Sequence, residues 1–182
     1  LPILKKENET KFEIPHELVE KFSKSKRPLL VLGNGFKISS IDSEKVKILI
    51  EHLNCPTLLT WASMDLIESD HPLIFGCAGG LAGVHSNKIL QSADFILFIG
   101  TRLDLLTTGF NPNNYGKNAN RFLIDCDENE LGKFRNIKNL TTINAKIFNA
   151  LESLLKISVK KEGLHDWINN CTELKIKNER DE

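Results

Sequence analysis

The stretch PLLVLGNG, residues 28–35, indicates the fold class of this chain. A continuous apolar run is stopped by two glycines, without the apolar–polar alternation of a strand that has one solvated face. Such a run is typical of a strand buried on both sides within a parallel sheet. The runs DFILFIG at 94–100 and RFLID at 121–125 have the same character. We therefore expect a central sheet that is covered by helices on both faces.

Helical patterns separate these strands. After a cap at Asp42 or Ser43, apolar residues at positions 46, 49, 50 and 53 follow the i, i+3, i+4, i+7 rule. Further helices are predicted after Pro15, over 84–93, and after the sequence DENE, where the spacing of Asp127 and Glu130 predicts a capping box. The last helix of the predicted core should direct five apolar residues inward: Ile147, Phe148, Leu151, Leu154 and Leu155.

Short strands over 56–60 and 139–145 complete an alternation of strands with helices. Because parallel neighbours need crossover connections, this alternation predicts an α/β fold: a doubly wound, mostly parallel six-stranded sheet with helices on both faces, like a nucleotide-binding fold. We divide the chain into a linker and lead-in helix at 1–26, a central α/β domain at 27–158, and a terminal helix with a polar tail at 159–182. The start at Leu1 and the tail LKIKNERDE suggest a piece of a longer polypeptide, with a further domain on each side.

Composition excludes several classes of partner. Lys and Arg together number 24, equal to Asp and Glu, so no excess positive charge is available to attract nucleic acid or an anionic membrane. No apolar run is long enough to cross a bilayer, and the start carries no signal sequence, so we expect a cytoplasmic protein. Four scattered cysteines without a CxxC pair predict reduced, buried thiols rather than a metal site or a disulfide.

Candidate ligand-binding residues follow the strands, because open parallel sheets bind ligands beyond the carboxyl ends of their strands. Glycines allow close approach of the backbone, and an arginine is a fixed cation suited to a pyrophosphate. The candidate residues for cofactor binding are Gly33, Gly35, Thr60, Gly76, Gly79, Gly80, Gly100, Arg102, Asp125 and Asp127. No residue is predicted to be catalytic or to bind a metal, since no GxSxG, HExxH or GxxxxGK[ST] motif occurs and the five histidines lack ligand spacing.

Each candidate also has a structural interpretation. Gly33 and Gly35 lack the third glycine of a dinucleotide fingerprint, since position 38 is Ile, and a tight turn after a strand needs glycine in any case. The glycine-rich segment FGCAGGLAGVH at 75–85 suits either an anion cradle or a surface loop that packs against another domain. Arg102 can pair with a neighbouring aspartate. Asp125 and Asp127 suit helix capping.

The order of these segments resembles the central domain of thiamine-diphosphate enzymes, and the acetolactate synthase group above all. The similarity lies in KRPLLVLGNG, CPTLLTWASMD, HPLIFGCAGGLAGVHSNKILQSADFILFIGTRLD and RFLIDCDENELGK, which together cover residues 26–134 in uninterrupted order. Leu1-Pro2 also resembles the close of that family's pyrimidine-binding domain, and Trp167 the entry into the diphosphate-binding domain.

The resemblance implies a three-domain subunit of a homodimer or homotetramer that decarboxylates a 2-keto acid and transfers the resulting two-carbon unit. Thiamine diphosphate and magnesium would lie between the outer domains, which are missing here, together with the family's GDG…N motif. The chain alone would then be inactive. Its partners would be the pyrimidine- and diphosphate-binding domains of the same polypeptide.

In acetolactate synthases the central domain binds FAD, whereas relatives bind another nucleotide or none. FAD-binding members continue their R-x-D motif with an acidic and a basic residue, but this chain continues with Leu-Leu-Thr-Thr-Gly at 105–109. Two other interpretations stay open. The chain can be a free-standing FAD- or NAD-binding module, or an interdomain or oligomerisation module. In the last case it would use an apolar stripe on the terminal helix, which either serves as an interface or covers the core: Leu164, Trp167, Ile168 and Cys171.

Overall fold

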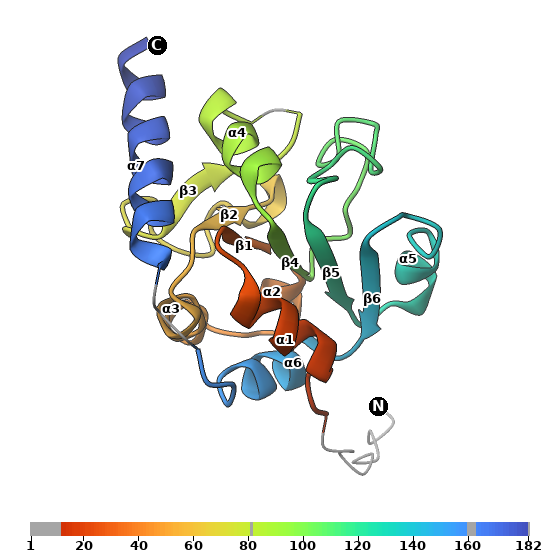
Figure 1. Cartoon of the computed structure of the whole chain (residues 1–182). Coiled ribbons are helices and arrows are strands. Elements are labelled where there is room, and N and C mark those ends of the chain that lie inside the picture. The colour runs from red at the N-terminus through yellow and green to blue at the C-terminus, as the bar shows by residue number, and fades with distance from the viewer. Residues whose placement is uncertain (1–11, 81, 160–162, 182) are drawn as a thin grey trace.

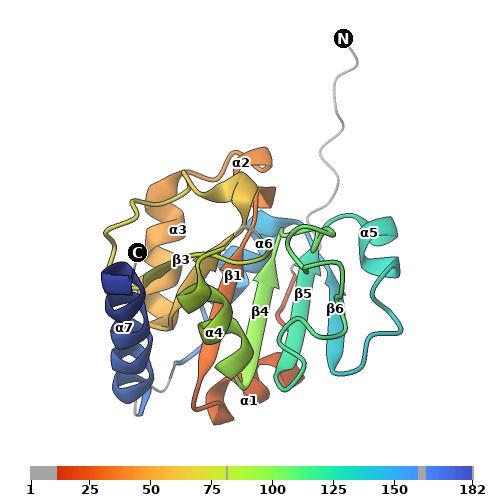
Figure 2. The ribbon, with the colours of Figure 1, turned by 90° about the horizontal axis from the view of Figure 1, so that it is seen from above.

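The computed structural model describes residues 12–80, 82–159 and 163–181 and contains one parallel sheet between two layers of helices (Figure 1). All neighbouring strands are parallel, in the order β3-β2-β1-β4-β5-β6, and the arrows of β4, β5 and β6 run side by side in Figure 2. The strands are β1 (Pro28–Leu32), β2 (Thr57–Leu59), β3 (Ile74–Cys77), β4 (Phe95–Ile99), β5 (Asn120–Asp125) and β6 (Leu140–Asn144). The predicted doubly wound fold is confirmed.

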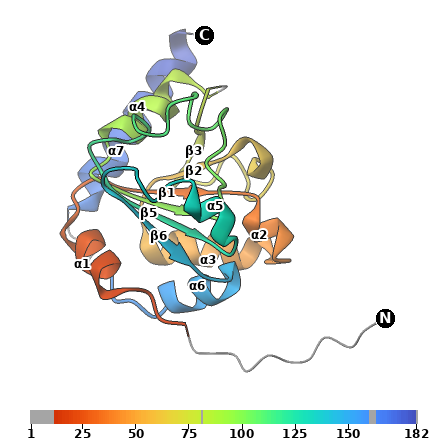
Figure 3. The same ribbon diagram turned by 90° about the vertical axis from the view of Figure 1, so that its right-hand side faces the viewer.

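Helices cover both faces of this sheet, as Figure 3 shows. One layer contains α1 (His16–Lys24), α2 (Gly35–Ile38), α3 (Ser43–Leu53) and α6 (Ile147–Leu154). The other layer contains α4 (Val84–Ser92), α5 (Glu128–Gly132) and α7 (Leu164–Asp181). A single 3-10 turn, η1 (Trp61–Ser63), follows β2. Leu1, Pro2 and the last residue of the predicted polar tail lie outside the described residues.

The unbroken apolar runs are explained by these two layers. In β1, Leu30 and Leu32 point into the core with α3 and α6, whereas Leu29 and Val31 point into the core with α4 and α7. Successive side chains of a strand face opposite sides, so every position must be apolar when both sides are covered. All five residues of β1 are buried, and so are all five of β4.

The predicted N-caps form at the first turns of α3 and α5, although at α5 only half of the predicted capping box forms. Asp42 caps α3, accepting a hydrogen bond from the backbone N–H of Lys45 at 2.8 Å. Asp127 caps α5 by accepting from the N–H of Asn129 at 2.9 Å. The second half of the predicted capping box is wrong, because the N–H of Asp127 donates to Asp125 instead and the carboxylate of Glu130 pairs with a lysine.

Three further details differ from the sequence-based expectations. The segment 75–85 is not all loop, since its first three residues belong to β3. Phe148 does not point inward: it is 44% exposed, with the ammonium of Lys45 5.2 Å from its ring centre. The four cysteines are free, but Cys126 is exposed and Cys77 only half-buried, so the prediction that each is buried fails for these two.

The apolar stripe of α7 covers the core. Leu164, Trp167 and Cys171 are buried, and the indole N–H of Trp167 donates to the carbonyl oxygen of Pro28 at 2.9 Å. This bond ties α7 to the first residue of β1. The stripe is therefore part of the domain's own packing, which is the second of its two interpretations, and it is not an exposed face.

Candidate functional site

The loops after β1 and β4 meet at the point where the chain reverses its order across the sheet. The N–H of Gly33 donates to the carbonyl oxygen of Ile99, and that of Gly35 to Gly100, each at 3.0 Å. A Cβ at Gly33 would overlap the carbonyl oxygen of Gly100, so no side chain fits there. Strands that diverge at such a switch point leave a crevice beyond their carboxyl ends.

A pocket of about 430 Å³ occupies this place, within the usual range for small-molecule sites. Seven of the ten candidate residues line it, contributed by loops from all parts of the sheet: Gly35, Thr60, Gly80, Gly100, Arg102, Asp125 and Asp127. Gly33, Gly76 and Gly79 do not line it. We call this pocket the crevice.

The three remaining glycines allow the chain to pack against itself. Gly33 lies against Gly100, as described above, and Gly76 lies beside Ser86 of α4. Gly79 has φ +123° and would bring a Cβ within 2.9 Å of the backbone of Thr107. The glycine-rich segment thus allows two loops of the same domain to cross, which is a third explanation beside an anion cradle and a contact with another domain.

The loop after β2 is tied firmly to β1. Ser63 donates its hydroxyl to the carbonyl oxygen of Leu32 at 2.8 Å, and the N–H of Thr60 donates to the same carbonyl at 3.0 Å. The hydroxyls of Thr60 and Ser63 are also 3.0 Å apart. These bonds fix the wall of the crevice from which Trp61 projects, two-thirds exposed.

The loop after β4 has an unusual backbone. Gly100, Arg102 and Leu103 have φ of +61°, +52° and +45°, although residues with a side chain seldom adopt this left-handed region and pay about 1 kcal/mol or more to do so. Between them Thr101 is 5% exposed, and its buried hydroxyl has no hydrogen-bond partner among the described residues. Strain and an unsatisfied polar group together are typical of a binding site.

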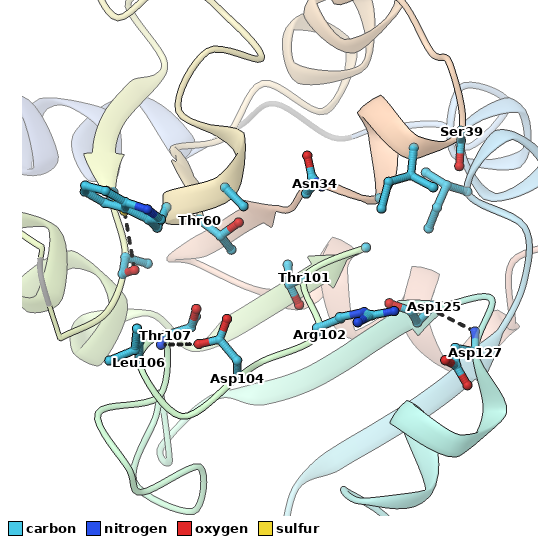
Figure 4. Close-up of a pocket in the computed structure, with 18 of the residues that line it drawn as sticks. Asn34, Ser39, Thr60, Thr101, Arg102, Asp104, Leu106, Thr107, Asp125 and Asp127 are labelled. Atoms are coloured by element: carbon cyan, nitrogen blue, oxygen red, sulfur yellow. Dashed lines mark hydrogen bonds between the residues drawn. The ribbon is translucent and has the colours of Figure 1, made fainter.

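Three carboxylates and one cation line the crevice. Asp104 accepts from the N–H of Thr107 at 2.7 Å and Asp125 from that of Asp127 at 3.0 Å, so both carboxylates help to shape loops (Figure 4). Arg102 extends toward Asp125 and Asp127 in Figure 4. Within the described residues it makes no ion pair, so the predicted pairing with an aspartate does not occur, and its guanidinium can meet a ligand.

A buried arginine holds the long connection between β4 and β5. Arg121 is 3% exposed and donates to the carbonyl oxygens of Pro112 and Tyr115, at 3.0 and 2.9 Å, and to that of Lys138. Its burial lowers the pKa of the guanidinium. Arg121 therefore shapes the loop that carries Leu106 to the crevice wall.

Burial also affects a thiol at the crevice. Desolvation raises the pKa of Cys77, whose side chain lines the crevice.

The structure also adds residues to the wall that the sequence did not single out: Ile38, Ser39, Leu106, Thr107 and Ile147. Cys77 and Ala78, between the candidate glycines 76 and 79, line it as well; Cys77 is the last residue of β3, a strand that the glycine-rich composition concealed. The apolar triplet at 73–75 was the available signal for this strand. His71 and His85 flank the glycine-rich segment but do not line the crevice.

Large apolar side chains are exposed in the segments that follow β1, β2, β3 and β4: Ile38, Trp61, Met64, Val84, Leu105, Leu106 and Phe110. Three of them, Ile38, Trp61 and Leu106, line the crevice, and exposed apolar surface at a pocket commonly marks a binding surface. No described helix is long and apolar enough to cross a membrane. Nor do three or more His, Cys, Asp or Glu residues converge on a metal-binding arrangement in the part of the chain that the structure describes.

The strand order and the crevice at the switch point define a doubly wound α/β domain, with the strand order of the dinucleotide-binding folds. Within this class the chain matches the family model "Thiamine pyrophosphate enzyme, central domain" over residues 16–154. The chain therefore belongs to the family of central domains of thiamine pyrophosphate enzymes, and the suspected resemblance is confirmed.

Curated relatives agree with this assignment. The chain is 32% identical over 162 residues to the acetolactate synthase large subunit of Lactococcus lactis, which covers 88% of this chain and 27% of the relative. It is 31% identical over 144 residues to acetolactate synthase isozyme 1 large subunit of Escherichia coli, covering 79% and 24%. A 3D-(3,5/4)-trihydroxycyclohexane-1,2-dione hydrolase of Bacillus cereus is 30% identical over 158 residues, covering 87% and 22%. The chain thus spans about a quarter of the length of these relatives.

Proposed function

We propose that this chain is the central domain of a thiamine-diphosphate-dependent 2-keto acid decarboxylase or carboligase of the acetolactate synthase kind. The family match over residues 16–154 and the identity to acetolactate synthase large subunits support this proposal. In the complete enzyme, thiamine diphosphate and Mg²⁺ would supply the chemistry of decarboxylation, held by the pyrimidine- and diphosphate-binding domains. This chain would contribute a scaffold and no catalytic residue.

The same proposal gives the crevice a nucleotide, either FAD or another nucleotide with an ADP moiety, in a structural role. The observation that carries it is the position of the Arg102 guanidinium, the one cation among the described lining residues, at the switch point of the sheet. An arginine there can hold a diphosphate through several N–H donors. The glycines at 35 and 100 line the crevice and pack backbone against backbone, since a Cβ at Gly35 would come within 2.7 Å of the Cα of Gly100.

Nucleotide binding can be measured on the 182-residue chain. A ligand at one hundred times its Kd stabilises the folded state by about 2.7 kcal/mol, which for a domain of this size raises the Tm by several degrees. We expect ADP or FAD to produce such a rise, and the variant Arg102→Met to reduce it. The exposed Arg135, outside the crevice lining, provides the control Arg135→Met. No rise with millimolar ADP, NAD or FAD would contradict nucleotide binding.

The catalytic assignment needs the complete polypeptide, which we expect to be a cytoplasmic homodimer or homotetramer. It should decarboxylate a 2-keto acid such as pyruvate when thiamine diphosphate and Mg²⁺ are added, whereas the 182-residue chain should show neither activity nor calorimetric binding of thiamine diphosphate. Turnover by the short chain would refute the scaffold role. A complete polypeptide without cofactor-binding domains would favour the alternative, a free-standing nucleotide-binding module.

A further inference from the structure

Trp61 is an exposed tryptophan whose side chain contributes little to the core of the domain. It is the first residue of η1, lines the crevice, and is 66% exposed. The other tryptophan, Trp167, is 5% exposed and hydrogen-bonded to β1. A large aromatic ring that is fixed at the mouth of a pocket but contributes little to the core is a surface prepared for a ligand or partner.

The wall behind this ring is rigid. Trp61 directly follows Thr60, which is bonded to β1 through its backbone N–H and to Ser63 through its hydroxyl. The backbone that carries the indole is therefore already ordered before any ligand arrives. A preorganised aromatic ring loses little conformational entropy on binding, which favours stacking.

The crevice has chemically different ends. Trp61 follows β2, whereas Arg102 follows β4, and β1 lies between these two strands. Neighbouring strands are about 4.8 Å apart, so the two loops begin about 10 Å apart. The intervening wall contains Asn34, Gly35 and Gly100, none of which carries a charge. Because the Arg102 side chain extends away from β2, toward Asp125 and Asp127 (Figure 4), a ligand that contacts both ends must separate its apolar ring from its anionic group by a spacer of at least this length.

We infer that Trp61 is the ring-stacking residue of the crevice, and that the ligand places a planar heteroaromatic ring on its indole while Arg102 holds an anionic group at least about 10 Å away. This inference rests on the proposed nucleotide-binding function. Charge limits the ligand: three aspartates and one arginine line the crevice, so beyond the anionic group at Arg102 the ligand, its ring included, should carry no further negative charge. Stacking on an indole face suits such a ring.

The test uses the 182-residue chain with ADP, NAD and FAD as probes in titration calorimetry. The probe that binds the wild-type chain most tightly is then measured with three variants. Trp61→Ala should weaken its Kd about tenfold, as loss of one stacked ring does, and Trp61→Phe should restore most of the affinity. Phe110→Ala is the matched control, because Phe110 is a large aromatic residue that is 71% exposed, as Trp61 is exposed, but does not line the crevice.

Fluorescence gives a second measurement. Acrylamide should quench Trp61 freely in the unliganded chain and much less in the complex, while the buried Trp167 stays protected in both. The inference is overturned if Trp61→Ala binds the probe as tightly as Phe110→Ala, or if the probe leaves acrylamide quenching unchanged. If Arg102→Met weakens binding of the probe but Trp61→Ala does not, the proposed nucleotide-binding function stands and the stacking role of Trp61 is refuted. Failure of all three probes to bind the wild-type chain would remove both.

Discussion

Replacing Thr101 with valine should make the free chain more stable, although a hydrogen-bonding group is removed. The side chain is 5% exposed, and its hydroxyl is buried without a partner among the described residues. An unsatisfied buried hydroxyl costs about 1–3 kcal/mol of desolvation. Valine has nearly the same shape and no polar atom to desolvate. We therefore expect a gain of about 1 kcal/mol in the free energy of unfolding and a rise of about 2–4 °C in Tm.

Urea denaturation followed by circular dichroism measures this gain, and Thr57→Val is the matched control. Thr57 is also a buried threonine of the sheet region, but its hydroxyl donates to the carbonyl oxygen of Cys55 at 3.3 Å. The control should lose about 0.5–1.5 kcal/mol, because a made hydrogen bond is removed. If Thr101→Val is destabilised as much as the control, the hydroxyl of Thr101 is satisfied in solution and the reasoning fails.

Three further perturbations test the packing of the domain. Arg121→Met should lose about 3 kcal/mol or more, because three backbone carbonyl groups lose a charged donor, and hydrogen exchange should accelerate in 111–119 while β1 stays protected; equal protection in 111–119 would contradict this. Trp167→Ala should lose about 3–5 kcal/mol in urea denaturation, since α7 loses its buried anchor; a near-neutral result would show that α7 is dispensable. Burial raises the pKa of the Cys171 thiol to about 12, above the value of about 8.5 in an unfolded chain. The folded state therefore holds this proton more tightly, and its stabilising effect is complete below about pH 8.5 and declines toward pH 12 by up to about 1.4 kcal/mol per pH unit. Burial also raises the pKa of the Cys55 thiol, which adds to the slope, so Cys171→Ala should reduce the alkaline slope without abolishing it, and an unchanged slope would refute the assignment.

The sequence predicted best the strands and helices whose buried positions accept only apolar residues. Strands β1 and β4 are covered on both faces, so their apolar runs could hardly be misinterpreted, and α3 follows its apolar period and its Asp42 cap. Phe148 was placed wrongly because an apolar residue beside the inward stripe fits the same period, and only tertiary packing decides that it is exposed.

The candidate site was predicted by topology rather than by any one motif. Residues after the strands do meet at one edge, as parallel strands require. Glycines were the ambiguous part, because close approach of a ligand and close approach of another loop need the same missing side chain. Gly35 lines the crevice and also packs against the backbone of Gly100, whereas Gly79 lies outside the crevice and allows two loops to cross. The fold decides whether a ligand or another loop fills the space beside a glycine, and the neighbouring residues in the sequence do not show which of the two it is.

The order of the strands has a consequence for folding. Pro28 of β1 pairs with Phe95 of β4 in the middle of the sheet, and β2 and β3 lie between them in the sequence. During synthesis β1 can pair with β2 early, but its other edge stays open until β4 has left the ribosome. Contacts between distant parts of a chain form slowly, because a long loop must close first. Closing the β1–β4 pair is therefore the step that we expect to limit folding, and until then the apolar edge of β1 is exposed to aggregation.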